Sequence, residues 1–174
     1  MPTPTDERVI PVKIGNHLEF GQRLRDLSLS LTGQLPDYEK QVRAVAISWL
    51  RLAIEHLAEA QRALGSRMPR AAYSRAYYAA YNASKAVRFM SIGRVSVHGD
   101  DHKKATELPA DFPDHAKWSV DITSLYEHRL RADYDNWSNS VNENSLAAAD
   151  SVQLAGRFLQ DCQTYLSSTF QVRP

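Results

Sequence analysis

The chain has 174 residues, which is long enough for one domain with a buried core and short for two. Its 21 lysines and arginines are nearly balanced by 20 acidic residues, and the net charge of +1 excludes binding to nucleic acid or an anionic membrane through bulk charge alone. A single cysteine excludes an intramolecular disulfide framework, and no apolar run reaches the length of a signal peptide or a membrane span, so we expect a cytoplasmic protein without membrane attachment.

Four prolines punctuate the first 36 residues, where leucines recur only weakly at helical spacing. We predict that residues 1–36 form an N-terminal arm that holds at most one short helix. Sustained patterning begins at residue 37, so residues 37–174 are predicted to form the folded bundle.

Four segments carry apolar residues at spacings of three and four, which is typical of helices with one buried face. We predict helices over about residues 37–64, 69–91, 114–134 and 144–170. Residues 92–114 contain two glycines, two prolines and no sustained period, so we predict a long irregular connection of a kind that often carries function. Strand alternation is not found, and the predicted fold is an all-α, up-and-down bundle of four main helices.

The predicted helix over residues 69–91 has three faces. A stripe of alanines on the first lets a neighbouring helix approach closely. The second carries Tyr73, Tyr77 and Tyr81, which either edge the core or stack on bases, and we favour the core for Tyr73 and Tyr77. The third is a candidate face for binding nucleic acid or a partner and consists of Arg75, Tyr78, Asn82 and Lys85.

An arginine lies on the apolar face of the predicted helix over residues 114–134. At about 100° per residue, Arg129 and Asp133 align with the apolar residues Trp118, Ile122 and Leu125. A guanidinium at such a position needs a carboxylate, a cleft or a bound anion to offset its desolvation. Arg129 and Asp133 therefore form either a buried ion pair or part of a functional site.

Three stretches of sequence together resemble the HEPN superfamily. They read HLAEAQRAL at 56–64, YSRAYYAAYNASKAVRFM at 73–90 and LYEHRLRADY at 125–134. The last two are similar to a subgroup with a YYAAY second helix and an R-x-x-A-D-Y third helix, and the resemblance covers about residues 38–168. It implies a four- or five-helix bundle that commonly dimerises and occurs in prokaryotic toxin–antitoxin and defence systems.

The resemblance implies that catalytic members are metal-independent RNA endonucleases, in which an arginine near the third helix is followed, after four to six intervening residues, by a histidine. Such a pair suits metal-free cleavage, which needs a base for the 2′-hydroxyl proton and a cation for the phosphorane. Here Arg129 is followed at that distance by Tyr134, Asp135 and Asn136. The missing histidine argues against the usual route and leaves Arg129, Asp133 and Tyr134 as the catalytic candidates.

Other histidines are possible replacements. Arg51 and His56 have the required spacing, but they point about 140° apart on a helix, so we interpret that match as accidental. His98 and His102 either fold over the end of the third helix or remain solvated, and we favour solvation while keeping both as candidate binding residues. The HGDDH segment at 98–102 has no fixed ligand geometry, so we predict no metal and no cofactor.

Three functions therefore remain open. We favour an HEPN-like homodimer of a prokaryotic defence or toxin–antitoxin type system that binds RNA or a partner, such as a cognate antitoxin or a nucleotidyltransferase-like protein. The first alternative is a metal-independent endoribonuclease that uses Arg129 with a non-standard base. The second is a non-catalytic homodimeric scaffold whose polar core residues only set the helix register.

Overall fold

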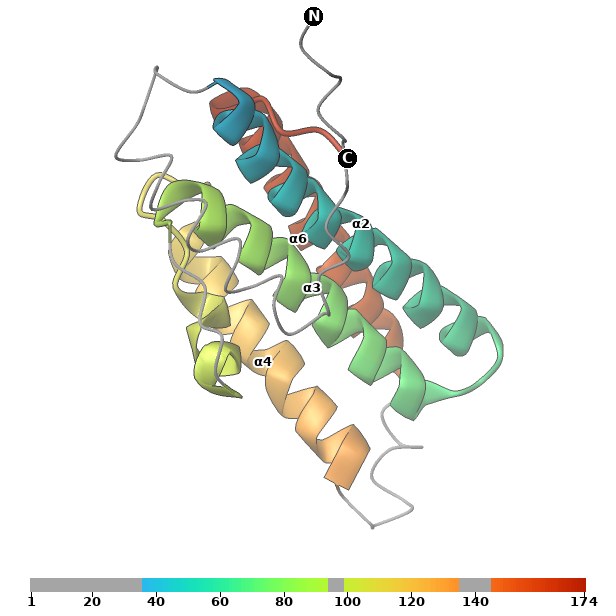
Figure 1. The fold of residues 1–174 in the computed structure, drawn as a ribbon. Coiled ribbons are helices and arrows are strands. Elements are labelled where there is room, and N and C mark those ends of the chain that lie inside the picture. Colours follow the sequence, from blue (N-terminus) through green and yellow to red (C-terminus); the bar gives the residue numbers. More distant parts are fainter. Residues whose placement is uncertain (1–35, 94–98, 135–144) are drawn as a thin grey trace, which may run out of the picture.

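The computed structural model describes residues 36–93, 99–134 and 145–174, and four long helices run up and down beside one another (Figure 1). They are α2 (Pro36–Gly65), α3 (Pro69–Ser91), α4 (His115–Tyr134) and α6 (Ser145–Phe170). A short 3-10 helix, η1 (Gly99–Thr106), lies between α3 and α4. The all-α bundle is confirmed, and the predicted helix boundaries agree to within about one residue. The predicted arm lies almost entirely outside the described residues.

A tight turn reverses the chain between α2 and α3. Backbone hydrogen bonds from Ser66 to the Arg62 carbonyl (2.9 Å) and from Met68 to the Ala63 carbonyl (2.8 Å) close the end of α2. Pro69 then occupies the first turn of α3, where a missing N–H costs nothing because that N–H would have no helical partner. This turn makes α2 and α3 antiparallel neighbours.

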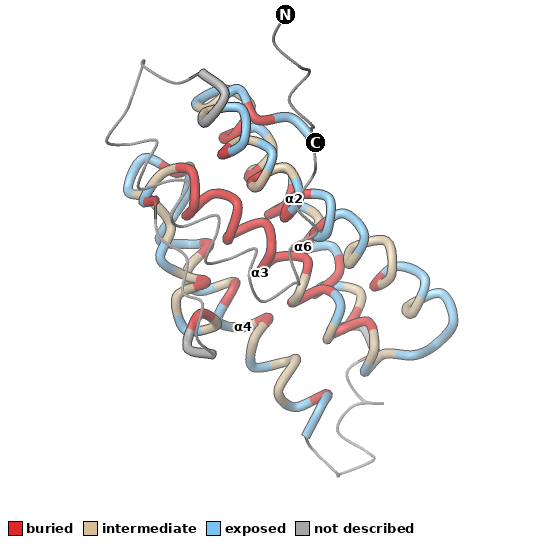
Figure 2. Tube along the Cα trace, viewed as in Figure 1, coloured by how far each residue is buried: buried red, intermediate tan, exposed pale blue. Residues whose placement is uncertain are grey.

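Helix α3 is the centre of the bundle and is buried over nearly its whole length (Figure 2). It packs against α2, α4, α6 and η1. Its alanines allow this crowding, since a methyl group lets neighbouring backbones approach closely, and Ala72, Ala76, Ala79, Ala83 and Ala86 are all fully buried. Gly93, with a φ of 75°, ends the helix by donating its N–H to the Arg88 carbonyl.

The apolar face of α4 packs on the core. Trp118, Ile122 and Leu125 are buried as predicted, and the Trp118 indole donates to Asp161 of α6 at 3.0 Å. Farther along, the side chain of Arg129 is 14% exposed and that of Asp133 is 28% exposed. Because Ala132 on the same side of α4 is again buried, Arg129 lies at the border between core and solvent and not outside the core.

The described part of the connection after α3, residues 99–114, is more ordered than its composition predicts. It contains η1, and it contributes Ala105 and Phe112 to the core. Phe112 lies edge-on to Tyr165 of α6, with ring centroids 5.1 Å apart. Residues 94–98 are not among those described, so His98 has no structural assignment. Within the described ranges, no helix is long and apolar enough to cross a membrane.

Candidate functional site

Tyr78 of α3 and Arg129 of α4 join two helices at the edge of the core. The Arg129 guanidinium donates from Nη2 to the Tyr78 hydroxyl at 3.3 Å, and its Cζ lies 5.7 Å from the centre of the Tyr78 ring. The same guanidinium lies 5.5 Å from the ring of Tyr134, which is 70% exposed. Arg129 is thus placed between two tyrosines, of which one faces solvent.

Asp133, one turn beyond Arg129, supplies the negative charge that a half-buried guanidinium requires. Its Oδ2 lies 2.7 Å from Nε of Arg129, so the two residues form an ion pair, one of the two arrangements that the sequence leaves open. The N–H of Nε is nevertheless badly aligned, and this fully buried atom makes no hydrogen bond to any group in the described parts of the chain. The pair is therefore held by charge and close contact, and not by an aligned hydrogen bond from Nε.

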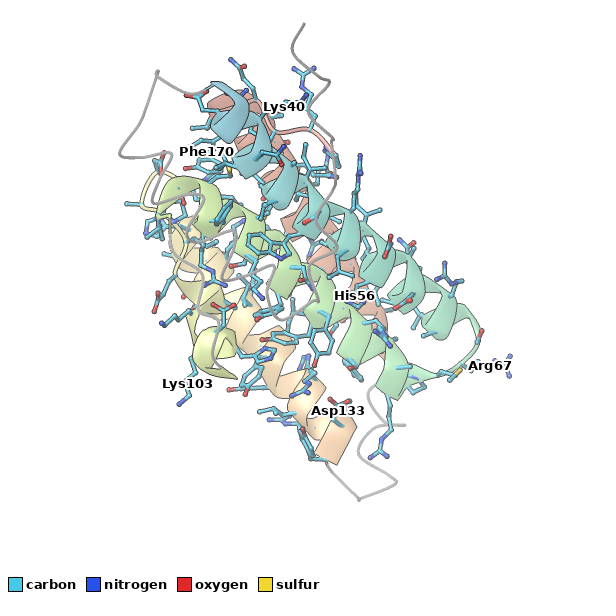
Figure 3. The ribbon with its side chains drawn as sticks, viewed as in Figure 1. Lys40, His56, Arg67, Lys103, Asp133 and Phe170 are labelled. Atoms are coloured by element: carbon cyan, nitrogen blue, oxygen red, sulfur yellow. The ribbon has the colours of Figure 1, made fainter. Side chains whose placement is uncertain are left out.

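Arg75 extends this polar region from α3 to α2. Its Nε lies 3.2 Å from the Glu59 carboxylate, and its Nη1 lies 3.3 Å from Nδ1 of His56. The His56 ring lies 5.6 Å from the Tyr78 ring, so the two clusters are continuous. His56 on α2 and Asp133 on α4 are labelled in Figure 3. We call Arg75, Tyr78, Arg129, Asp133 and Tyr134 together the Arg129 surface.

His102 of η1 packs beside this surface against aromatic side chains. Its ring stacks on Tyr81, with centroids 4.5 Å apart and planes 24° apart, and its Nδ1 lies 2.8 Å from the Tyr77 hydroxyl. Burial, and next the charge of Arg129, hold the pKa of His102 below its usual value. The expectation of a solvated loop histidine is wrong, because the aromatic face of α3 receives the ring.

A buried ion cluster anchors η1 to α3. Arg88 donates from Nη1 and Nη2 to the two carboxylate oxygens of Asp101, each at 3.1 Å, and the Tyr81 hydroxyl donates to Oδ2 at 2.8 Å. Lys85 approaches Oδ2 to 3.7 Å. Burial alone would raise the pKa of Asp101, but the hydrogen bonds and charge of Arg88 keep it below its usual value. Asp101, which lies in the HGDDH segment, is thus engaged by cations of the protein itself.

The structure separates the candidate residues into two groups. Arg75, Tyr78, Arg129, Asp133 and Tyr134 lie together on one surface, and His102 lies close to them. Lys85 and Asn82 are buried, so their prediction as binding residues is corrected: η1 covers that part of α3, and Asn82 Nδ2 donates to the Tyr78 carbonyl at 2.8 Å. Tyr73, Tyr77 and Tyr81 are all buried, as the core interpretation predicts.

Several residues of the site were not predicted from the sequence. His56, Glu59 and Tyr126 are not among the candidate residues that the sequence indicates. His56 and Glu59 lie one turn apart beside the candidate Arg75, and this spacing was the available signal. No local signal marked Tyr126, whose ring comes within 5.3 Å of Tyr77 only through the packing of α4 on α3.

A groove lies apart from the Arg129 surface. An open groove of about 600 Å³ runs between α2 and α6 and is lined by residues that include Gln61, Gln153, Arg157 and Gln160. In residues 36–93, 99–134 and 145–174, no three histidine, cysteine or acidic side chains come together as a possible metal site.

Comparison with known families gives one finding. The family model described as HEPN domain matches residues 46–165, which include α3, η1, α4 and most of α2 and α6. Searches against curated proteins and against solved structures gave no match.

Proposed function

The chain belongs to the HEPN domain family, and from that premise we propose that it binds single-stranded RNA on the Arg129 surface. One observation carries the proposal. The Arg129 guanidinium lies at the border between core and solvent, within 5.7 Å of the centre of the Tyr78 ring and 5.5 Å of the exposed ring of Tyr134. A cation beside an exposed aromatic ring is the pair of groups that a single strand requires.

Different side chains would contact the phosphates and the bases of the strand. A planar guanidinium presents several N–H donors to phosphate oxygens, so Arg129 would contact the backbone. Tyr134 is exposed and can stack on a base without regard to its identity. Arg75, which is exposed on the neighbouring helix, would contact a second phosphate. The site would therefore recognise the strand more than its sequence.

Acidic side chains moderate this binding. Asp133 pairs with Arg129 and Glu59 pairs with Arg75, so each arginine must partly exchange a carboxylate for a phosphate. With a net charge of +1, the protein offers little long-range attraction to compensate. We therefore expect modest affinity that weakens as salt rises.

The experiment is fluorescence anisotropy with an end-labelled single-stranded RNA, comparing the wild-type protein with Arg129→Gln. We expect the substitution to weaken binding by about tenfold, as for loss of one charge-assisted phosphate contact. The matched control is Arg157→Gln, which removes an exposed arginine of α6 from the groove between α2 and α6. It should change the affinity by less than about twofold.

Circular dichroism of both variants checks that the helices remain folded. Equal losses in the two variants would mean that binding follows overall charge and would contradict the proposed site. Absence of binding by the wild-type protein would contradict the proposed function itself.

A further inference from the structure

His128 of α4 lies where α3, α4 and α6 meet. Its Nδ1 is 3.1 Å from the Ser151 hydroxyl of α6, and its ring lies edge-on to Tyr73 of α3, with ring centroids 5.5 Å apart. Ser151 and Tyr73 are both buried. The imidazole is therefore part of the packing of three helices, and Arg129 is the next residue of the chain.

Two hydrogen bonds join α4 to α6 among the described residues. Near the start of α4, the Trp118 indole donates to Asp161 at 3.0 Å, and the contact of His128 with Ser151 is the other. The two lie ten residues apart, which is about 15 Å along a helix. A helix held at two such points can pivot about the first when the second is lost. His128 thus sets where the C-terminal half of α4 lies against α6.

Arg129 lies on a different side of α4 from His128. One residue turns a helix by about 100°, so Arg129 is directed away from α6, and its Nη2 donates to the Tyr78 hydroxyl of α3 at 3.3 Å. That hydrogen bond is already long, and a shift of about 1 Å would break it. A change in the packing of His128 would therefore separate Arg129 from Tyr78.

The junction favours a neutral imidazole. The titratable and charged groups around it are Tyr73 on α3, Glu127 and Arg131 on α4, and Asp150 on α6. Burial, and next the charge of Arg131, hold the pKa of His128 below its usual value, and the charge of Glu127 only partly opposes them. The Ser151 hydroxyl can donate or accept, so its contact with Nδ1 suits either tautomer of the ring.

Protonation of His128 acts against this packing. The packed ring has a lowered pKa, so it binds protons less readily than a ring in water, whose pKa is about 6.5. The stability that the packed neutral ring contributes is complete above that value and is lost as the pH falls below it. Acid therefore favours separation of the C-terminal half of α4 from α6.

We propose that His128 is a positioning residue of the Arg129 surface: the neutral ring holds the C-terminal half of α4 on α3 and α6, and protonation releases that half. Release separates Arg129 and Tyr134 from Tyr78, so the released form lacks the surface to which RNA binds. The effect on RNA rests on the proposed function, whereas the release itself is measured without a ligand.

Amide hydrogen exchange at pH 7.5 and pH 5.5, corrected for the intrinsic exchange rates, measures the release. For residues 126–132 of the wild-type protein, we expect protection to fall by about threefold to tenfold at the lower pH, tenfold being the limit for one group with an ordinary pKa of about 6.5. Residues 119–123, close to the Trp118 hydrogen bond, should keep their protection to within about twofold.

Two asparagine variants assign the release to one histidine. In His128→Asn, an amide takes the place of Nδ1 and can still bond to Ser151, but it does not titrate, so protection should be equal at both pH values. His115→Asn removes an exposed histidine from the first turn of α4 and should behave like the wild-type protein. His102, which lies beside Arg129, is present in all three proteins and cannot cause a difference between them.

The affinity for single-stranded RNA, measured by anisotropy at pH 7.5, tests the positioning. His128→Ala removes the contacts with Ser151 and Tyr73, and we expect binding about fivefold weaker, as for loss of one hydrogen bond. His128→Asn should bind within about twofold of the wild-type protein. Restoration by asparagine distinguishes positioning through Ser151 from a direct contact of the imidazole with RNA.

Two results would overturn the inference and leave the proposed function standing. One is a fall in the protection of residues 126–132 that is absent from the wild-type protein or equally large in His128→Asn. The other is RNA binding by His128→Ala with the wild-type affinity. Failure of the wild-type protein to bind RNA would overturn the proposed function and the role of His128 in binding together.

Discussion

Arg129 and Asp133 form an ion pair of 2.7 Å along one turn of α4, yet the guanidinium Nε that makes it has no hydrogen bond among the described residues. An arginine followed by an aspartate is the less favourable order for an isolated helix, so local helix stability does not explain the pair. We interpret Asp133 as a counter-ion that keeps Arg129 at the border of the core until an anion competes for it.

Asp133→Asn tests this interpretation, because we expect it to increase the affinity for RNA. Removing the carboxylate frees Arg129 for phosphate and removes a repulsive charge, so RNA affinity should rise by about fivefold, corresponding to roughly 1 kcal/mol. Asp121→Asn is the matched control, since Asp121 also pairs with a cation four residues away on α4 but lies far from Arg129. Unchanged or weaker binding by Asp133→Asn, measured by anisotropy, would contradict the counter-ion role.

The Arg88–Asp101 pair should dominate the stability of the η1 region. Arg88→Met removes the guanidinium that pairs with the buried Asp101 carboxylate, and we expect it to cost about 3–5 kcal/mol in urea unfolding. Arg43→Met breaks an exposed pair with Glu39 and should cost less than about 1 kcal/mol. Similar costs for the two substitutions would show that the buried pair does not anchor η1.

Acid should weaken the same anchor. The pKa of Asp101 lies below its usual value in the folded protein, so the carboxylate contributes stability above about pH 4, and this contribution is lost as the pH falls through the lower folded value. Unfolding free energies measured from pH 6 down to pH 2 should therefore fall more steeply for the wild-type protein than for Asp101→Asn. If the unfolding free energies of the two proteins fell in parallel with pH, Asp101 would not be the group that stabilises the fold in this range.

Histidine titration by NMR tests the proximity of His102 and Arg129. The charge of Arg129 contributes to the lowered pKa of His102, so Arg129→Gln should raise that pKa. The pKa of His128 is lowered by burial and then by Arg131, so Arg131→Gln should raise it and leave His102 unchanged. If both substitutions moved both histidines equally, the specific placement of His102 beside Arg129 would be wrong.

Much of the fold follows from the sequence because helical periodicity is a local property. The patterns over α2, α3, α4 and α6 specify both the length of each helix and the face that is buried. By contrast η1 has eight residues and is held by Arg88 and Ser84, which lie far away in the sequence. No periodicity can reveal a segment whose order depends on tertiary contacts.

The same difference explains the outcome for the candidate site. Helical spacing correctly grouped Arg75 with Tyr78 and Arg129 with Asp133. The same spacing predicts that Lys85 and Arg75 share one face of α3. In the structure, the connection after α3 covers this face at Lys85, whereas Arg75 remains exposed. Where a long connection lies is set by its contacts, so neither the burial of Lys85 nor the position of His102 could be predicted.

Gly156→Ala tests the packing of α6 on α2. A Cβ at this position would lie 3.7 Å from Leu57 Cδ2, which is ordinary van der Waals contact. Because glycine in a helix interior costs about 1 kcal/mol relative to alanine, the substitution should stabilise the protein by that amount in urea unfolding. Destabilisation would mean that α2 and α6 lie closer together than the structure has them.

The most direct test of RNA binding at the Arg129 surface is the NMR signal of the Arg129 Nε–H group during titration with a short single-stranded RNA. This group lies 2.7 Å from the Asp133 carboxylate, so a phosphate that competes with Asp133 for the guanidinium should shift its signal. We predict that this signal moves together with the backbone amides of Tyr78 and Tyr134, while those of Gln153 and Arg157 on the α2–α6 groove stay in place. Shifts confined to the α2–α6 groove, with the Arg129 signal unmoved at saturation, would contradict the account.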